Sequence, residues 1–280
     1  MDRVTRRKFL GQISGCGGML VLSAAGGVGY MSAVEPRRLV LERVDVRVET
    51  LPSRLGGFRI VQLSDIHCGP DVRAQDIARA VSMSIDLEPD LVVLTGDYVY
   101  QSASYADACA GELAPLARAT QALACLGNHD CRRGAVKVAG ALTKAGIVVL
   151  RNEARCVRDG LWVGGLDDAL VGWPNVNRVL RQVPSDATLL VLVHEPDYAD
   201  VVAATGRVAL QLSGHSHGGQ VRIPLVGAPV LPILARKYPA GLYDLGQMRL
   251  YVNRGVGLTR PAIRFNCRPE VTLITLLSPE

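Results

Sequence analysis

The segment Phe58–Gly69, FRIVQLSDIHCG, carries the pattern that decides the fold. The run from Phe58 to Asp65 is rich in apolar residues and ends in a polar cluster, which is typical of a buried strand. Four more runs of this kind follow along the chain, at Leu91–Asp97, Leu123–Asp130, Thr188–His194 and Val208–His215. We therefore predict five buried strands, each followed at once by polar side chains.

Helical periods separate these strands. Ile77, Val81 and Ile85 recur every four residues before Pro89, and a second apolar period ends at Gly146. Strands that alternate with helices predict repeated βαβ units and a largely parallel sheet covered by helices.

Composition and texture indicate a single α/β domain. The 280 residues are 49% apolar and 20% charged, which excludes collagen, coiled coil and disorder. After Gly218 the chain is punctuated by Pro and Gly, with further strands expected at Met248–Asn253 and Val271–Leu277. Because no repeat or low-complexity linker divides the chain, residues 40–280 are expected to form one domain.

The polar clusters are expected to meet at the carboxyl edge of the sheet, and all five histidines of the chain lie in them. This convergent set offers carboxylate, amide and imidazole ligands and needs no thiolate. Such ligands suit Mn, Fe or Zn ions. The predicted metal ligands are Asp65, His67, Asp97, Asn128, His194, His215 and His217.

The order of these clusters, D-x-H, G-D, G-N-H-D, H and G-H-x-H between Arg59 and Gln220, resembles the calcineurin-like metallophosphoesterase superfamily. The segments Tyr251–Gly257 and Arg268–Glu270 resemble its small bacterial branch of exported or membrane-associated phosphodiesterases. The resemblance implies a four-layered αββα sandwich and a metal-dependent phosphoester hydrolase, either a phosphodiesterase or a phosphomonoesterase.

The resemblance also implies a role for each site residue. One metal would be held by Asp65, His67, Asp97 and His217. The other would be held by Asp97, Asn128, His194 and His215, so that Asp97 bridges the two. His129 resembles the catalytic histidine of the family, with Asp130 as its orienting partner.

Phosphate chemistry explains why such an arrangement is useful. Two divalent cations can clamp a phosphoryl group and convert a bridging water to hydroxide for in-line attack. The departing alkoxide then needs a proton, which a histidine supplies. The alternative is a catalytically inactive, membrane-tethered binding protein of the same fold, against which the complete ligand set argues.

The last cluster also contains a motif that is typical of a different class of hydrolase. Gly214-His215-Ser216-His217-Gly218 also fits G-x-S-x-G, the nucleophile elbow of α/β hydrolases. That motif requires a helix after the serine, and the residues after Ser216 predict a turn and a strand instead. We therefore do not expect Ser216 to be a nucleophile.

The first 34 residues are interpreted as a targeting signal. Arg6 and Arg7 precede 26 uncharged residues, Phe9–Val34, and this pattern resembles a twin-arginine (Tat) export signal. No A-x-A site follows, so a cleaved signal and a retained membrane anchor both stay open. The expected location is the periplasm or the extracytoplasmic face of the cell membrane, with the Tat machinery as a partner.

The cysteines leave their pairing open. Seven cysteines contain no C-x-x-C, which excludes a zinc ribbon and a thioredoxin-like site. Cys16 lies in a weak lipoprotein-like context. Cys68 and Cys131 each follow a predicted site residue, where a disulfide or an extra soft ligand competes with plain packing.

The substrate class is suggested by charge and by one apolar segment. The net charge is +5, of which +3 lies in residues 1–34, so the near-neutral remainder argues against a nucleic-acid partner. Pro224–Ala235 is uncharged and is followed by Arg236 and Lys237. Such a rim would suit a membrane surface or a lipid-linked phosphoester, whereas the alternative is that it packs on the sheet.

Overall fold

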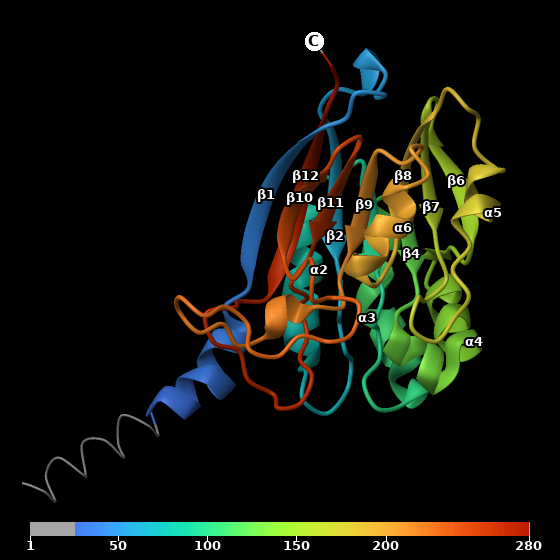
Figure 1. The fold of residues 1–280 in the computed structure, drawn as a ribbon. Helices are drawn as coiled ribbons and strands as arrows, with labels where there is room; N and C mark the ends of the chain where they lie inside the picture. Colours follow the sequence, from blue (N-terminus) through green and yellow to red (C-terminus); the bar gives the residue numbers. More distant parts are fainter. Residues whose placement is uncertain (1–25, 280) are drawn as a thin grey trace, which may run out of the picture.

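Two six-stranded sheets stacked face to face form the centre of the protein, in a computed structural model that describes residues 26–279. Helices cover the outer face of each sheet, so the layers run helix, sheet, sheet, helix (Figure 1). This confirms the four-layered αββα arrangement in a single domain. The expectation of one largely parallel sheet was wrong, because the five predicted strands are divided between two sheets.

The first sheet holds three of the predicted strands in parallel. Beside the first of these, Phe58–Leu63, lies the antiparallel strand Glu270–Leu277, and the edge strand Val40–Arg47 is parallel to Glu270–Leu277. The order across the sheet is β1 (Val40–Arg47), β12 (Glu270–Leu277), β2 (Phe58–Leu63), β3 (Leu91–Thr95), β4 (Ala122–Cys125), β5 (Val148–Val149).

The second sheet holds the other two of the five buried strands and also the strand expected at Met248–Asn253, whereas the strand expected at Val271–Leu277 is in the first sheet. Its four central strands are parallel, and the strand at each edge is antiparallel to its neighbour. The order is β10 (Gly241–Leu245), β11 (Met248–Val252), β9 (Leu210–Ser213), β8 (Thr188–Leu192), β7 (Leu161–Gly165), β6 (Glu153–Arg158).

Five α-helices of the described residues complete the outer layers. The first sheet is covered by α2 (Ala74–Asp86), α3 (Ala106–Ala119) and α4 (Asn128–Lys144). The second is covered by α5 (Val176–Leu180) and α6 (Ala199–Ala203). Short 3-10 and π turns lie at Tyr30–Val34, Glu35–Arg37, Ser53–Leu55, Ala103–Tyr105, Pro196–Tyr198 and His217–Gly219.

The apolar runs are continuous because each strand is buried on both faces. In β2, Ile60 packs in the core between the two sheets, whereas Val61 and Leu63 pack under the helices. Successive side chains of a strand point to opposite faces, so both faces need apolar residues. The strands end before the polar residues, so the predicted runs are a few residues too long and the site residues lie in the loops beyond them.

The N-terminal part of the described chain packs against the body. Glu35 and Pro36 are buried, and Glu35 accepts a hydrogen bond from the Cys267 backbone N–H at 2.7 Å. Arg6, Arg7 and Cys16 lie outside the described residues, so their expected roles remain predictions. Between residues 26 and 279, no helix has the length and apolar character that crossing a bilayer requires.

Candidate metal centre

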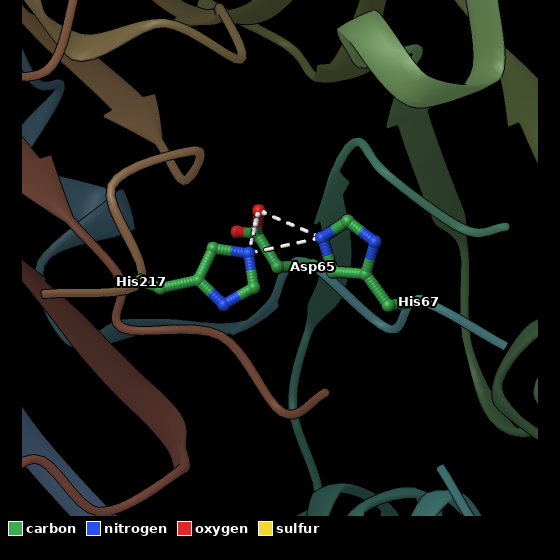
Figure 2. Close-up of side chains that lie close together, drawn as sticks. All are labelled: Asp65, His67 and His217. Carbon is green, nitrogen blue, oxygen red and sulfur yellow. Dashed lines mark hydrogen bonds and ion pairs between the residues drawn. The ribbon is translucent and has the colours of Figure 1, made fainter. Parts of the chain in front are cut away.

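The polar loops of both sheets meet at one edge of the molecule. Loops after β2, β3 and β4 come from the first sheet, and loops after β8 and β9 come from the second. Asp65, His67 and His217 form one group there, with the carboxylate pointing between the two rings (Figure 2). Asp65 Oδ1 lies 3.2 Å from His217 Nε2, and the two Nε2 atoms are 2.9 Å apart.

A second group lies beside the first. Asp97, His194 and His215 offer ligand atoms within 4.8 Å of one another. Asp97 Oδ2 lies 3.1 Å from His194 Nε2 and 3.5 Å from His67 Nε2. Asp97 therefore stands between the two groups, where a bridging ligand would be needed.

Unpartnered buried atoms indicate that these groups would accept cations. Asn128, the first residue of α4, has a buried Oδ1 with no hydrogen-bond partner, and His194 Nε2 has none either. A buried polar atom without a partner is costly, about 1–3 kcal/mol, unless it has a ligand. The donor set of carboxylate, amide and imidazole atoms fits Mn, Fe or Zn ions.

The backbone is strained where it presents these side chains. Positive φ angles between 49° and 67° occur at five of the predicted ligands. Residues other than glycine avoid this region, at a cost of roughly 1–3 kcal/mol each, and such strain gathers at functional sites. The five are Asp65, His67, Asp97, His215 and His217.

Two glycines of the motifs let the backbone approach the carboxylates. A Cβ on Gly127 would overlap the Asp97 carboxylate, and one on Gly214 would overlap Ser64 and the Asp65 carboxylate. The glycines in G-N-H-D and G-H-x-H are therefore required by space around the site.

Two imidazoles are oriented by backbone carbonyls. His194 Nδ1 bonds to Thr95 O at 2.7 Å, and His215 Nε2 bonds to Ile233 O at 2.9 Å. Each ring donates through that nitrogen and leaves the other as a potential ligand. Motif reading did not reveal the contact from Ile233, since it depends on where a distant loop folds.

Burial and mutual attraction set the charge of the site. Burial would raise the pKa of Asp97, but the surrounding imidazoles, His194 foremost, together outweigh it and lower that pKa well below its usual range. The pKa of Asp65 is lowered in the same way by the imidazoles around it, His217 foremost, and the two carboxylates in turn raise the pKa of His194 against the effect of its burial. Burial lowers the pKa of His215 and of His217 to about 4. Ionised carboxylates and neutral rings are the forms that bind cations.

His129 lies at the rim of the site and is half-buried. Its backbone N–H donates to Asp97 Oδ1 at 2.8 Å. Its ring stands edge-on to His67, with centroids 4.9 Å apart, and lies 5.4 Å from the ring of Tyr100. Tyr100 was not among the residues predicted from sequence, because it lies three residues beyond Asp97 in a loop without a motif.

Asp130 is not placed as an orienting partner of His129. Its buried carboxylate accepts backbone N–H groups of Asp97 and Gly127 through Oδ2, at 2.8 and 3.0 Å. Its Oδ1 accepts those of Tyr98 and Val99 at 2.9 and 3.2 Å. No hydrogen bond joins it to the His129 ring among the described residues. The carboxylate thus braces the loop after β3 rather than the histidine.

The remaining polar residues near the site have other surroundings. Ser216 is buried, its Oγ accepts the Gly218 backbone N–H at 3.0 Å, and only a 3-10 turn follows it, so the nucleophile elbow is absent at this position. Cys68 and Cys131 are free thiols, as are the other four described cysteines. No cysteine joins the metal-binding groups found among residues 26–279.

The fold and this site define a metal-dependent phosphoesterase. The family model for calcineurin-like phosphoesterases matches residues 58–219, so the chain belongs to this family and is a phosphoester hydrolase.

Similar proteins agree with that assignment. The chain is 34% identical to the uncharacterized metallophosphoesterase YkuE of Bacillus subtilis, with 99% of each chain covered. It is also 34% identical to the phosphodiesterase YaeI of Escherichia coli, with 98% of this chain and 100% of that one covered. UDP-2,3-diacylglucosamine pyrophosphatase LpxG of Chlamydia muridarum is 26% identical, over 89% of this chain and 92% of that protein.

The fold has relatives among solved structures. TT1561 of Thermus thermophilus superimposes with a TM-score of 0.53 over 71% of this chain and 90% of that one, at 12% identity. Structural similarity at this level of sequence identity supports a shared fold only.

Proposed function

We propose that the protein hydrolyses phosphoesters with two divalent cations held side by side at the edge shared by the sheets. One cation would be bound by Asp65, His67, Asp97 and His217, and the other by Asp97, Asn128, His194 and His215. The observation that carries the proposal is the position of Asp97, whose Oδ2 lies 3.1 Å from His194 Nε2 and 3.5 Å from His67 Nε2.

The chain's own residues divide the work around the substrate. When bound, two such cations would polarise the phosphoryl group and supply an activated water. His129 would donate a proton from its ring to the departing oxygen, since that ring is half-exposed at the rim of the site, with a nitrogen within 4.8 Å of ligand atoms of His67 and Asp97. Burial lowers the pKa of His129, which makes its protonated ring a stronger acid.

The proposed substrate is a lipid-linked phosphoester. An apolar segment beside the site is open to solvent, with Leu225 and Val230 exposed on it. The similarity to a pyrophosphatase named for a diacylated sugar nucleotide is consistent with this class of substrate. Arg6 and Arg7 ahead of an uncharged run support export by the Tat route to the extracytoplasmic side.

The metal requirement is tested by removing and restoring ions. Chelation should abolish hydrolysis of bis(p-nitrophenyl) phosphate, and adding back Mn, Fe or Zn should restore it with two metal ions per chain by elemental analysis. Asp97→Asn should lose both ions, because its carboxylate faces both groups. Asp159→Asn is the matched control, since this aspartate lies on the surface and pairs with Arg54. A metal-free protein that retains full activity would refute the two-metal proposal.

The lipid-linked substrate is tested separately. Turnover of a polyprenyl or diacyl phosphoester should exceed turnover of its short-chain analogue at equal concentration. Equal rates on both would remove the lipid from the proposal and leave the hydrolase in place.

A further inference from the structure

The segment after the metal-binding loop exposes a group of large apolar side chains. We call Ile223–Ile233 the rim loop. Leu225 is exposed at 108% of its reference area, Val230 at 75% and Val226 at 72%. Ile223 and Ile233 are exposed as well. The alternative left open by the sequence was that this segment packs on the sheet. The exposure of these five side chains shows that they do not.

Leu225 occupies a backbone conformation that does not suit it. Its φ is +68°, at the tip of a tight turn in which the N–H of Gly227 donates to Ile223 O at 2.8 Å. Glycine or asparagine is favoured there, and leucine carries a steric cost. The Leu225 side chain is not buried in the protein, so no packing within the protein offsets this steric cost. An exposed apolar side chain of this kind is suited to contact with a surface outside the protein.

The rim loop is joined to the metal centre. Ile233 O bonds His215 Nε2 at 2.9 Å, and the next residue, Leu234, accepts the Asp197 backbone N–H through its carbonyl at 2.8 Å. A surface bound by the rim loop would therefore lie next to the reacting groups.

The N-terminal segment approaches the same face. Tyr30 and Pro224 line one cavity of about 480 Å³, so the start of the described chain lies beside the rim loop. Figure 1 shows this segment, in blue, next to the orange loop that follows β9. The described residues Tyr30–Val34 belong to the uncharged run of the sequence and lie on the same face as the rim loop.

Cations flank this apolar surface. Arg236 is exposed just beyond the rim loop, and the exposed Arg268 lines the cavity shared by Tyr30 and Pro224, whereas the Nζ of Lys237 is paired with Asp200 at 2.8 Å. Apolar side chains bordered by Lys and Arg are what an interface with anionic lipids requires.

We propose that the rim loop docks on an anionic lipid bilayer, inserting Leu225 and its apolar neighbours and so placing the metal centre at the membrane surface. The inference rests on the proposed hydrolase function for its purpose, but the docking itself can be measured without any turnover. It would bring a phosphoester in the headgroup layer to the site without drawing its lipid fully out of the membrane.

Insertion is measured at one position in the full-length protein. Total binding to vesicles does not report on the rim loop, because the run Phe9–Val34 is itself apolar. Leu225→Trp is therefore compared with the wild type, on vesicles that contain phosphatidylglycerol with and without brominated acyl chains. We expect the added indole fluorescence to lose roughly half its intensity on the brominated vesicles. Val136→Trp, at an exposed valine of α4, is the matched control and should stay unquenched.

Substitution by a charge tests the consequence for catalysis. Leu225→Asp should slow hydrolysis of a vesicle-borne phosphoester about tenfold, the factor expected when one leucine no longer inserts. Turnover of bis(p-nitrophenyl) phosphate and the melting temperature should not fall, since aspartate tolerates the positive φ better than leucine. Val136→Asp should change neither rate.

The outcomes separate the two proposals. No quenching at position 225 beyond that at position 136 would overturn the docking, whatever the activity. Concentration-dependent self-association that Leu225→Asp abolishes would assign the surface to a second copy of the chain and also overturn it. If Leu225→Trp is quenched while the wild type hydrolyses no phosphoester, the function is refuted and the docking stands.

Discussion

Asp130→Asn is the substitution that best separates the two interpretations of this residue. The motif suggests that Asp130 orients His129, whereas the structure shows its carboxylate accepting four backbone N–H groups at 2.8, 2.9, 3.0 and 3.2 Å. Asparagine keeps one acceptor oxygen, and its amide NH₂ would face the two N–H donors that the second oxygen served.

The magnitude follows from those two lost bonds. Each buried N–H left without an acceptor costs about 1–3 kcal/mol. Part of this is offset, because burial and the nearby Asp97 raise the pKa of Asp130 to about 7, so the charged form is itself disfavoured. We expect a net loss of about 2–4 kcal/mol in the free energy of unfolding, or roughly 5–12 °C in melting temperature.

The assay pairs thermal melting with turnover. Melting is followed by circular dichroism for the wild type, Asp130→Asn and the surface control Asp159→Asn. Turnover is measured on an aryl ester, which has a good leaving group, and on an alkyl ester, which has a poor one. Asp130→Asn should have a lower melting temperature than the wild type, and it should change the turnover of both esters by the same factor.

One result would refute this reasoning. The result would be that Asp130→Asn has the melting temperature of the wild type but lowers turnover of the alkyl ester more than that of the aryl ester. The carboxylate of Asp130 would then act through His129. The backbone contacts would then contribute little to stability.

Three further predictions concern the site and the signal. His129→Ala should keep its metals and melting temperature but lose about 10²- to 10⁴-fold in kcat, most on poor leaving groups; equal loss on all esters would argue against proton donation. Gly214→Ala should lower metal content measured by elemental analysis, because the added Cβ displaces the Asp65 carboxylate; full metal occupancy would contradict the role assigned to that close approach. Changing Arg6 and Arg7 together to lysine should leave active enzyme inside the cell, and normal export by fractionation would show that the signal was misread.

The sequence by itself determined which side chains gather at the site. Asp65, Asp97 and Asn128 each follow an apolar run, and strand formation by such a run depends on its own residues and their burial. Polar residues after parallel strands must emerge at the carboxyl edge, whatever the rest of the fold. For this reason the convergence of these three residues of the first sheet could be anticipated before any long-range contact was known, whereas their meeting with the histidines after β8 and β9 depended on how the two sheets stack.

Other features depended on contacts between distant segments. The division of the strands into two sheets was not readable from the runs, since an apolar strand buried by helices on both faces looks the same as one buried by a helix and a second sheet. Motif order suggested the second sheet only through the family resemblance. Local periodicity carries no information about which strands pair across long stretches of chain.

Tertiary structure alone also decided the partners of single atoms. The carboxylate of Asp130 turned toward the loop after β3, and the carbonyl of Ile233 came to His215, because hydrogen bonds are satisfied by whichever groups folding brings within about 3 Å. Exposure of Leu225 was decided in the same way. A leucine between prolines is compatible with core or surface, and only the packing around it determines how much of its apolar area remains in water.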